Sequence, residues 1–310
     1  MKTNLKKILS IVLSALMLCG IFTVTGFAAD DAITVSFSAY DGSVLMPKQT
    51  LTVTDGIAEE YGYEIPETDH NGETVDGITA LDVLVAAHTE YYGDDFTAET
   101  ASDYLVIKQG QILLAFGKSA YASSFAVNND CPHDDNFNES WASYTGYGID
   151  EAVIEDGDYM AYFFYQDTKY YSDDYAWFTV DGESVTETYT KVNTAVTLTL
   201  EGYCYGWYSC SKDEDKGITA LAGVDVYLYS DGEYTLLGQT DENGQITVEL
   251  DTKGDFMICA YGTTVDSYGY STPVSAAWMD ISAVSGARYL WNKIVEFFTA
   301  IFAAIAALFS

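Results

Sequence analysis

Several stretches of the chain alternate apolar and polar residues, as β-strands with one buried face do. Residues 33–42 (ITVSFSAYDG) alternate as far as a turn at Asp41 and Gly42. Residues 196–200, 224–228 and 246–250 each place three apolar side chains on one face of a strand. These side chains are Val196, Leu198 and Leu200, then Val224, Val226 and Leu228, then Ile246, Val248 and Leu250. The pattern predicts a mainly β protein.

One stretch has helical spacing instead. In residues 77–93, Leu81, Leu84, Val85 and His88 recur at intervals of three and four, and Thr79 can cap the first turn. This stretch predicts the main helix, with His88 as a residue of the core or its rim. After it, two apolar runs around Gly110 predict a hairpin.

Residues 154–167 (IEDGDYMAYFFYQD) combine three acids around Gly157 with an aromatic run. The acids are typical of a tight turn. Beyond the turn, Tyr159, Ala161, Phe163 and Tyr165 would lie on one strand face, and Met160, Tyr162 and Phe164 on the other. A strand that is apolar on both faces is expected inside a sheet. We therefore expect a turn that leads into a central strand, rather than a catalytic pair of carboxylates.

The first block of the chain, from about residue 32 to 181, ends with residues 175–180 (YAWFTV). Its helix opening, GITALDVL, the VNN segment at 127–129 and the DGD turn before an aromatic strand resemble the transcobalamin-like C-terminal β-grasp family of secreted bacterial proteins. The resemblance implies an α+β domain of the β-grasp type, for which we expect the bounds 30–186.

The second block, residues 192–275, contains the three alternating strands and the segment TDENGQ, which has the residues of a hairpin turn. Its order of motifs resembles the prealbumin-like and collagen-adhesin B-type domains of Gram-positive surface proteins. The resemblance implies an immunoglobulin-like β-sandwich at 187–280. The expected fold is thus mainly β with one α+β domain, and a hydrophobic helix at 281–310 ends the chain.

Both ends of the chain are apolar. Three lysines precede the apolar run 8–24, and small residues follow it, so residues 1–29 are typical of a secretory signal peptide. The last residues form one helical apolar stripe, but the uninterrupted apolar run 297–309 is shorter than a membrane span of roughly 20 residues. We expect residues 289–310 to contact a membrane surface. Packing of this helix onto protein is the alternative.

The charge of the chain limits its partners. The formal net charge is −34, and it becomes −37 when the leader with its three lysines is removed. Arg288 is the only arginine, so the chain cannot neutralise a phosphate backbone and nucleic-acid binding is excluded. The many aromatic residues argue against a disordered acidic chain.

Metal chemistry is concentrated in residues 128–140 (NNDCPHDDNFNES). Cys131, His133, Asp134 and Asp135 combine thiolate, imidazole and carboxylate, which are ligands that zinc prefers. A closed zinc site needs four ligands, and no second Cys or His pair is placed to complete it, so a solvated acidic loop is the alternative. A Cys–His nucleophile would also need a third orienting group. We expect no enzymatic activity and no cofactor.

Two glycine-bearing loops offer aromatic side chains for ligand binding. They are WASYTGYG, with Trp141, Tyr144 and Tyr147, and YCYGWYSC, with Tyr205, Trp207 and Tyr208. Four cysteines follow the leader and allow three pairings in an exported chain. A bond between Cys204 and Cys210 would close the second loop, and one between Cys204 and Cys259 is the alternative.

These features predict an extracellular, cell-surface or membrane-associated binding or adhesion protein of a Gram-positive-type bacterium, which is not an enzyme. Its partner would be a glycan, a peptide or a host or cell-surface protein. A small-ligand carrier is the first alternative, cobalamin-like because of the family resemblance alone. A metal-dependent hydrolase is the second alternative.

Overall fold

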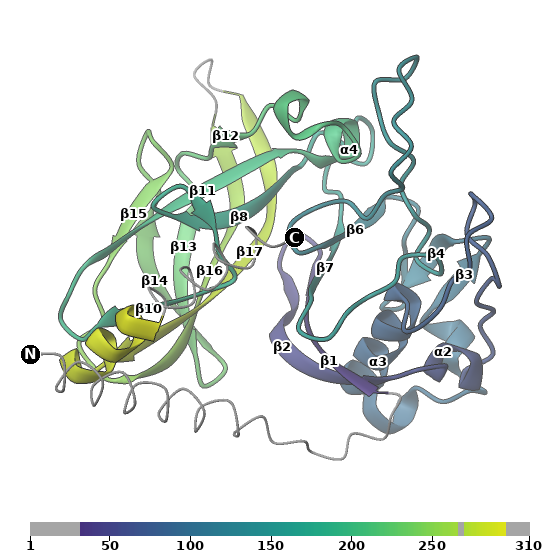
Figure 1. Ribbon diagram of the computed structural model, residues 1–310, viewed down its shortest axis with the longest axis horizontal. Coiled ribbons are helices and arrows are strands. Elements are labelled where there is room, and N and C mark those ends of the chain that lie inside the picture. Colours follow the sequence, from purple (N-terminus) through teal and green to yellow (C-terminus); the bar gives the residue numbers. More distant parts are fainter. Residues whose placement is uncertain (1–31, 266–269, 296–310) are drawn as a thin grey trace, which may run out of the picture. The chain divides into compact units, whose positions relative to one another are not determined.

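The computed structural model describes residues 32–265 and 270–295. Its first sheet has four strands in the order β2-β1-β7-β6 (Figure 1). The strands are β1 (Ala32–Tyr40), β2 (Val44–Thr54), β6 (Ser123–Val127) and β7 (Tyr159–Phe164). β7 runs parallel to β1, with Ser36 opposite Tyr159, and antiparallel to β6. Strands that are far apart in sequence therefore form the centre of this sheet.

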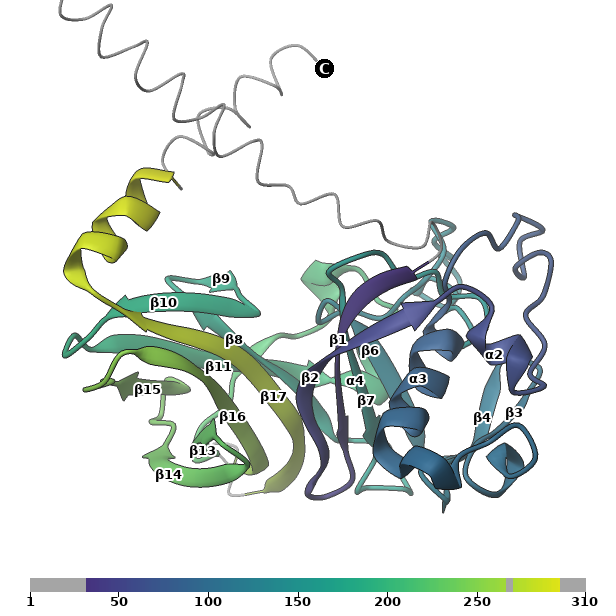
Figure 2. The same cartoon turned by 90° about the horizontal axis from the view of Figure 1, so that it is seen from below.

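Helix α3 (Ala80–Tyr92) is the helix expected from the sequence, and it packs against this sheet (Figure 2). The predicted cap at Thr79 is confirmed, because its side chain accepts from the Asp82 N–H while Asp82 Oδ2 accepts from the Thr79 N–H at 2.8 Å. Asp82 Oδ1 also accepts from the Ala58 N–H of helix α2 (Ile57–Glu60) at 3.0 Å. One buried carboxylate thus fixes the starts of two helices.

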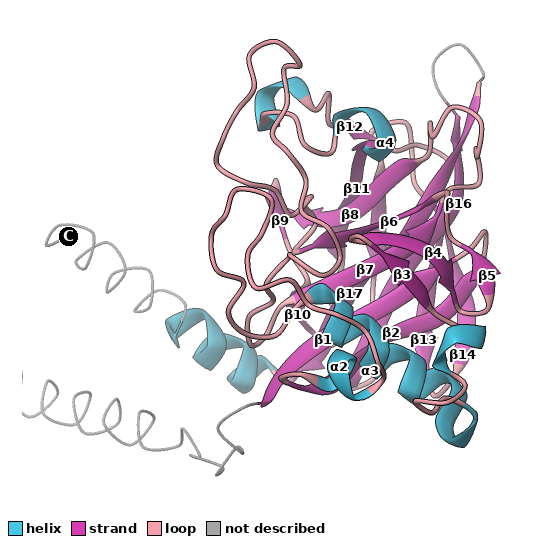
Figure 3. Cartoon of the chain, turned by 90° about the vertical axis from the view of Figure 1, so that its right-hand side faces the viewer, coloured by secondary structure: helices cyan, strands magenta, loops and turns pink. Residues whose placement is uncertain are grey.

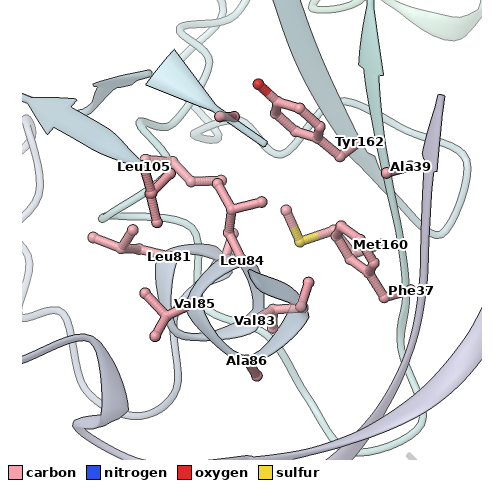
Figure 4. Packing of buried hydrophobic residues seen from close by; sticks show 14 of the residues in the cluster. Phe37, Ala39, Leu81, Val83, Leu84, Val85, Ala86, Leu105, Met160 and Tyr162 are labelled. Atoms are coloured by element: carbon pink, nitrogen blue, oxygen red, sulfur yellow. The ribbon is translucent and has the colours of Figure 1, made fainter. Parts of the chain in front are cut away.

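The apolar side of α3 forms the first core with the sheet (Figure 4). Its members include Leu81, Leu84, Phe37 and Met160, all of them fully buried. His88 is buried in the same region, as expected, and burial lowers its pKa to about 4. The neutral ring donates from Nδ1 to the Leu84 carbonyl at 2.7 Å and accepts the Phe116 N–H on Nε2 at 2.8 Å. His88 is therefore a structural residue.

A small three-stranded sheet lies beside this core, in the order β3-β4-β5. Its strands are β3 (Val106–Lys108), β4 (Gln111–Ala115) and β5 (Lys118–Ser119), and two 3-10 turns, Gly93–Asp95 and Ala101–Asp103, precede them. The predicted hairpin around Gly110 is confirmed, since Lys108 pairs with Gln111. Gln109 and Gly110 both have positive φ, at 51° and 72°, as the tight turn requires.

The prediction for residues 154–167 is also confirmed. Gly157 has a φ of 92° in a turn in which Asp158 accepts the Glu155 N–H and Asp156 accepts the Thr34 N–H, each at 2.8 Å. All six residues of β7 are buried. Met160, Tyr162 and Phe164 belong to the core with α3, whereas Tyr159, Ala161 and Phe163 belong to a second, largely aromatic cluster on the opposite face.

The rest of the fold is a ten-stranded sheet that makes the protein mainly β (Figure 3). Its main order is β12-β11-β8-β17-β16-β13-β14; in addition, β10 pairs with β17, β15 with β11 and β9 with β8. The strands are β8 (Asp174–Val180), β9 (Glu183–Ser184), β10 (Glu187–Lys191), β11 (Val196–Cys204), β12 (Thr219–Ala220), β13 (Asp225–Ser230), β14 (Glu233–Gln239), β15 (Gln245–Val248), β16 (Gly254–Val265) and β17 (Ser271–Val284). Between them lie the short helix α4 (Tyr205–Tyr208) and a 3-10 turn, Asp213–Asp215.

Two details of this sheet differ from expectation. Strand β8, which the sequence pattern placed at the end of the first block, pairs with β11 and β17 instead of joining the first sheet. The turn in TDENGQ forms, with Asp241 accepting the N–H groups of Asn243 and Gln245, but the strands on its two sides have different partners. β14 pairs with β13, and β15 pairs with β11. Strand pairing depends on contacts that alternation alone does not specify.

The apolar faces predicted for the second block are confirmed. Leu198, Leu200 and Val226 are fully buried, and all nine predicted positions belong to or pack against one core with Phe178, Ile258 and Met279. The opposite faces of several of these strands carry Tyr175, Trp177, Tyr203 and Trp278, which join the aromatic cluster that also contains Phe163 of β7.

The structure describes only a small part of the two ends of the chain. Residues 1–29, the predicted leader, and residues 296–310 are outside the described residues, whereas residues 286–295 are helical and follow β17, which extends to Val284. The helix therefore begins later than the expected residue 281. In the described ranges, no helix is both long and apolar enough to cross a membrane.

Asp82→Ala is expected to destabilise the fold. It leaves the buried N–H groups of Thr79 and Ala58 without their acceptor, and an unsatisfied buried donor costs about 1–3 kcal/mol. We expect a loss of about 2–4 kcal/mol in the free energy of unfolding, measured by urea denaturation. Glu90→Ala, at an exposed position of the same helix, should change it by less than about 0.5 kcal/mol. Equal effects of the two substitutions would contradict the role given to Asp82.

Candidate functional site

The candidate residues lie in two segments that contact each other. We call residues 128–147, between β6 and β7, the insertion, and residues 204–216, which contain α4, the α4 loop. The Tyr144 N–H donates to the Cys210 carbonyl at 2.7 Å. Lys216, which is 4% exposed, pairs with Asp130 of the insertion at 2.6 Å and with Asp213 of its own loop at 2.9 Å. These contacts fix the insertion against the α4 loop.

Further contacts hold the bases of the two segments. The Tyr205 hydroxyl donates to the Phe125 carbonyl, and the Tyr175 hydroxyl donates to Asn129 Oδ1 at 3.1 Å. The Lys212 ammonium lies 4.0 Å from the centre of the Phe137 ring, which is a cation–π contact. Aromatic side chains of β8, α4 and the insertion therefore position the two segments through these contacts.

The cysteine expected to pair within the α4 loop has a different neighbour. Cys210 Sγ lies 2.7 Å from Cys131 Sγ of the insertion, whereas Cys204 Sγ lies 3.6 Å from the Tyr171 carbonyl oxygen. The hydrogen bond with Cys131 lowers the pKa of Cys210, and the same contact raises the pKa of Cys131. Cys259 is fully buried in β16.

The four residues predicted as metal ligands do not converge. Cys131 is directed to Cys210, and Asp135 is exposed. The His133 ring stacks on Tyr144 with 4.2 Å between ring centres, and its Nδ1 lies 2.6 Å from the Asp134 carbonyl. Over residues 32–265 and 270–295, no group of three or more His, Cys, Asp and Glu side chains has the arrangement of a metal site. The insertion is thus organised by pairwise contacts within protein.

Asp134 is buried and holds the insertion to a distant loop through His70. His70 Nε2 lies 3.3 Å from Asp134 Oδ2, and Nδ1 lies 3.0 Å from Glu151 Oε2. Asp134 also accepts the Asn71 amide at 3.1 Å and the N–H groups of Asn136 and Thr145. The hydrogen bond to Glu151 raises the pKa of His70, partial burial opposes this, and Asp134 adds to the rise. A protonated His70 can donate to both carboxylates.

Two of the exposed candidates, Trp207 and Tyr208, lie beside two exposed tyrosines of the β7–β8 loop, and we define these four residues, Tyr170, Tyr171, Trp207 and Tyr208, as the aromatic patch. They are between 39% and 61% exposed. The Trp207 indole N–H donates to the Tyr170 carbonyl at 2.6 Å, so α4 and the β7–β8 loop are joined at the patch. Gly206 allows this contact, since a Cβ there would lie 2.5 Å from the Tyr171 carbonyl oxygen. The patch presents large rings on a backbone that is fixed by hydrogen bonds.

Acidic residues accept hydrogen bonds from the backbone next to the patch. Asp167 accepts the N–H groups of Lys169 and Tyr170 and the Ser172 hydroxyl, and the buried Asp173 accepts the N–H groups of Gln166 and Asp167. Asp174 is paired across the ladder with Cys204, and burial, with a smaller effect of Asp173, raises its pKa to about 6. These carboxylates order the loop that carries Tyr170 and Tyr171.

Only some of the predicted aromatic residues are displayed. Trp207, Tyr208 and Trp141 are exposed, with Trp141 at 78%. Tyr205 is 1% exposed, which corrects its assignment as a ligand contact, because a ring on the inner side of α4 completes the aromatic cluster. Tyr144 and Tyr147 are partly covered, and their rings contact those of His133 and His70.

Sequence reasoning missed His70, Tyr170 and Tyr171. His70 is separated from Asp134 by 64 positions and has no motif around it. A signal for the tyrosines does exist, since Tyr170 and Tyr171 stand side by side in a loop with flanking acids. Two surface pockets of the described residues lie elsewhere: one of about 570 Å³ is lined by Lys48, Tyr229 and Asp280, and one of about 360 Å³ borders His133, Tyr147 and Glu151.

The contacts of His70 predict a pH dependence of the insertion. The pKa of His70 in the folded chain is raised above the unfolded value of about 6.5. The contacts of His70 with Glu151 and Asp134 therefore stabilise the folded insertion fully at pH values below about 6.5. The stabilisation is lost as the pH rises through the folded pKa. We expect cleavage within the insertion, by a protease active from about pH 6 to 9, to accelerate across this range. The His70→Asn variant should be cleaved fast over the whole pH range. If its cleavage rate changed with pH as in the parent, the role given to His70 would be wrong.

Comparison with known proteins adds no relative from which a function could be transferred. No protein-family model matches the sequence. A search of the curated proteins finds no significant match. We therefore infer the function from the contacts of the insertion, the α4 loop and the aromatic patch.

Proposed function

We propose that this protein is a secreted, non-enzymatic binding protein of the cell surface and that its aromatic patch binds an uncharged glycan. The observation that carries the proposal is the exposure of Trp207, Tyr208 and Tyr170 on a backbone that hydrogen bonds and the docked insertion hold in place. Large rings that are already ordered lose little conformational entropy when they bind a ligand. Flat apolar faces of sugar rings match such side chains.

The charge of the chain supports an uncharged ligand. With a formal charge of −34 over the whole chain, the protein repels anionic polymers, including acidic glycans. Peptides and surface proteins are the other partner classes, and the binding experiment below includes them.

A catalytic function is a weaker proposal. The carboxylates that would be needed for acid–base chemistry accept backbone N–H groups, as Asp167, Asp173 and Asp158 do. Cys131 and His133 face different partners, so the contacts that a Cys–His nucleophile requires are not made. These observations favour binding over hydrolysis.

We further propose that the two blocks correspond to the families that the sequence resembles. In the first block, β1 and β2 precede α3, and β7 lies beside β1 and parallel to it, which supports a β-grasp-like module. In the second block, the core of Leu198, Val226 and Ile258 supports an immunoglobulin-like module of the prealbumin-like type. The patch would then be carried by a spacer that has no reactive chemistry of its own.

The tail gives a second point of attachment in this proposal. Leu290, Trp291 and Ile294 are between 40% and 62% exposed on the described part of the helix at 286–295. Apolar and aromatic residues exposed on one side of a helix are typical of attachment at a membrane interface. We propose that the helix binds a lipid surface and keeps the protein at the cell exterior.

The patch is tested by binding of the exported protein to an array of neutral glycans, acidic glycans and peptides. We expect neutral glycans to bind and Trp207→Ala to weaken binding by roughly tenfold or more, because a tryptophan at a binding hot spot contributes about 2 kcal/mol or more. Tyr121→Ala removes another exposed ring, outside the patch, and is the control. Selective binding of peptides, or equal binding by both variants, would overturn the glycan proposal.

The tail is tested by flotation of the exported protein with phosphatidylcholine vesicles, whose neutral surface avoids charge repulsion. Leu290→Asp should lower the floating fraction several-fold, since a charge on the apolar side opposes insertion. Asn292 lies on another side of the helix, in a surface pocket that residues of β10 and β17 also line. The Asn292→Asp variant adds the same charge there, and its floating fraction should equal that of the parent. No flotation of the parent, or an equal loss in both variants, would exclude lipid attachment through this helix.

A further inference from the structure

The two thiols that meet between the insertion and the α4 loop are placed for covalent chemistry. Cys131 Sγ and Cys210 Sγ are 2.7 Å apart, which is longer than the disulfide bond length of about 2.05 Å but short for two sulfur atoms that are not bonded. Two unbonded thiols have no strong attraction that would hold them at this distance, because S–H groups are weak donors and acceptors. The separation therefore indicates a pair that the surrounding backbone brings together.

The surrounding contacts fix both cysteines from the backbone. The Cys131 N–H donates to Asp130 Oδ1 at 2.7 Å, and Asp130 is itself paired with Lys216 of the α4 loop. The Cys210 carbonyl accepts the Tyr144 N–H, and the Ser209 N–H donates to the Tyr205 carbonyl. These backbone contacts place the two sulfur atoms opposite each other.

Gly146 provides the space for the pair. A Cβ at this position would lie 3.1 Å from Cys210 Sγ, which is a tight contact, and 3.5 Å from Cys131 Sγ, so a larger residue would crowd Cys210 Sγ. The other two cysteines have no such arrangement. Cys204 Sγ is directed to the Tyr171 carbonyl, and Cys259 is fully buried in the aromatic cluster.

We propose that Cys131 and Cys210 form a disulfide bond in the exported protein, and that Cys204 and Cys259 remain thiols. The bond would link the insertion covalently to the α4 loop across 79 positions of the chain. It would hold the segment that carries Trp207 and Tyr208 when the hydrogen bonds around it open. The proposal does not depend on which ligand the aromatic patch binds.

The reaction is an exchange with a disulfide-bearing oxidant, either a small molecule or an exported oxidoreductase. One thiolate, Cys210, attacks a sulfur of the oxidant, so that a mixed disulfide forms and one oxidant thiol leaves. Cys131 then loses its proton and attacks Cys210 Sγ, which forms the protein disulfide and releases the second oxidant thiol. Two protein thiols lose two protons and two electrons, and the oxidant disulfide gains them.

Thiol counting with peptide mapping tests the proposal on protein that has been exported and has lost its leader. Four cysteines remain in that chain. After denaturation without reductant, we expect two alkylated cysteines, and four after reduction. Chymotrypsin cleaves after Tyr208 and separates Cys204 from Cys210, so a non-reduced digest should yield the Cys131 peptide joined to the Cys210 peptide. Four free thiols, or a link that includes Cys204 or Cys259, would overturn the proposal.

The number of alkylated cysteines in two variants gives a second measurement, which can still be made if a variant is partly misfolded. Cys131→Ser leaves Cys210 without its partner and should raise the count of alkylated cysteines from two to three. Cys204→Ser keeps the pair and should lower the count to one, at Cys259. Proteolysis adds a structural measure: reductant should accelerate cleavage of the insertion several-fold in the parent and in Cys204→Ser, with no further effect on Cys131→Ser. Equal acceleration in all three chains would contradict the link.

Discussion

The burial of both faces of β7 is the constraint on which the rest of the structure depends. One face, with Met160 and Tyr162, completes the core under α3, and the other face, with Phe163, completes the aromatic cluster. A strand that must satisfy two cores tolerates no change of register, because a slip of one residue would exchange its faces. The acidic turn around Gly157 sets where this strand begins, so its polar residues serve the packing of the strand that follows.

The aromatic cluster connects β7 to the candidate site through side-chain packing. Tyr205, at the start of α4, is buried in the cluster and hydrogen-bonds to the strand next to β7, while Trp207, two residues later, faces solvent. A single turn of helix thus joins a buried anchor to an exposed ring. The insertion contacts the same loop from its other side through Tyr144 and Lys216. The backbone that carries the exposed rings is held in place because neighbouring residues in the sequence are buried or hydrogen-bonded.

The sequence was sufficient for features that depend on local order. The alternation in β7, the cap at Thr79, the turn at Gly110 and the apolar faces around Leu198 and Val226 all depend on residues within a few positions of each other. The pairing of β8 with β11, the meeting of Cys131 with Cys210 and the contact of His70 with Asp134 depend on segments that lie far apart in the chain. Periodicity describes which face of a strand is apolar, but it does not specify the strand or loop that will cover that face. The burial of Tyr205 was missed for the same reason, since nothing local distinguishes it from Trp207.

The parallel pairing of β1 with β7 also determines when the fold can form. Ser36 lies beside Tyr159, so the first strand finds its central neighbour only after more than a hundred further residues have been made. Closing so long a loop costs entropy before any contact repays it, and folds dominated by such pairings assemble slowly. The first sheet therefore cannot be completed until the chain has been made as far as β7, and the front half alone cannot reach its final packing.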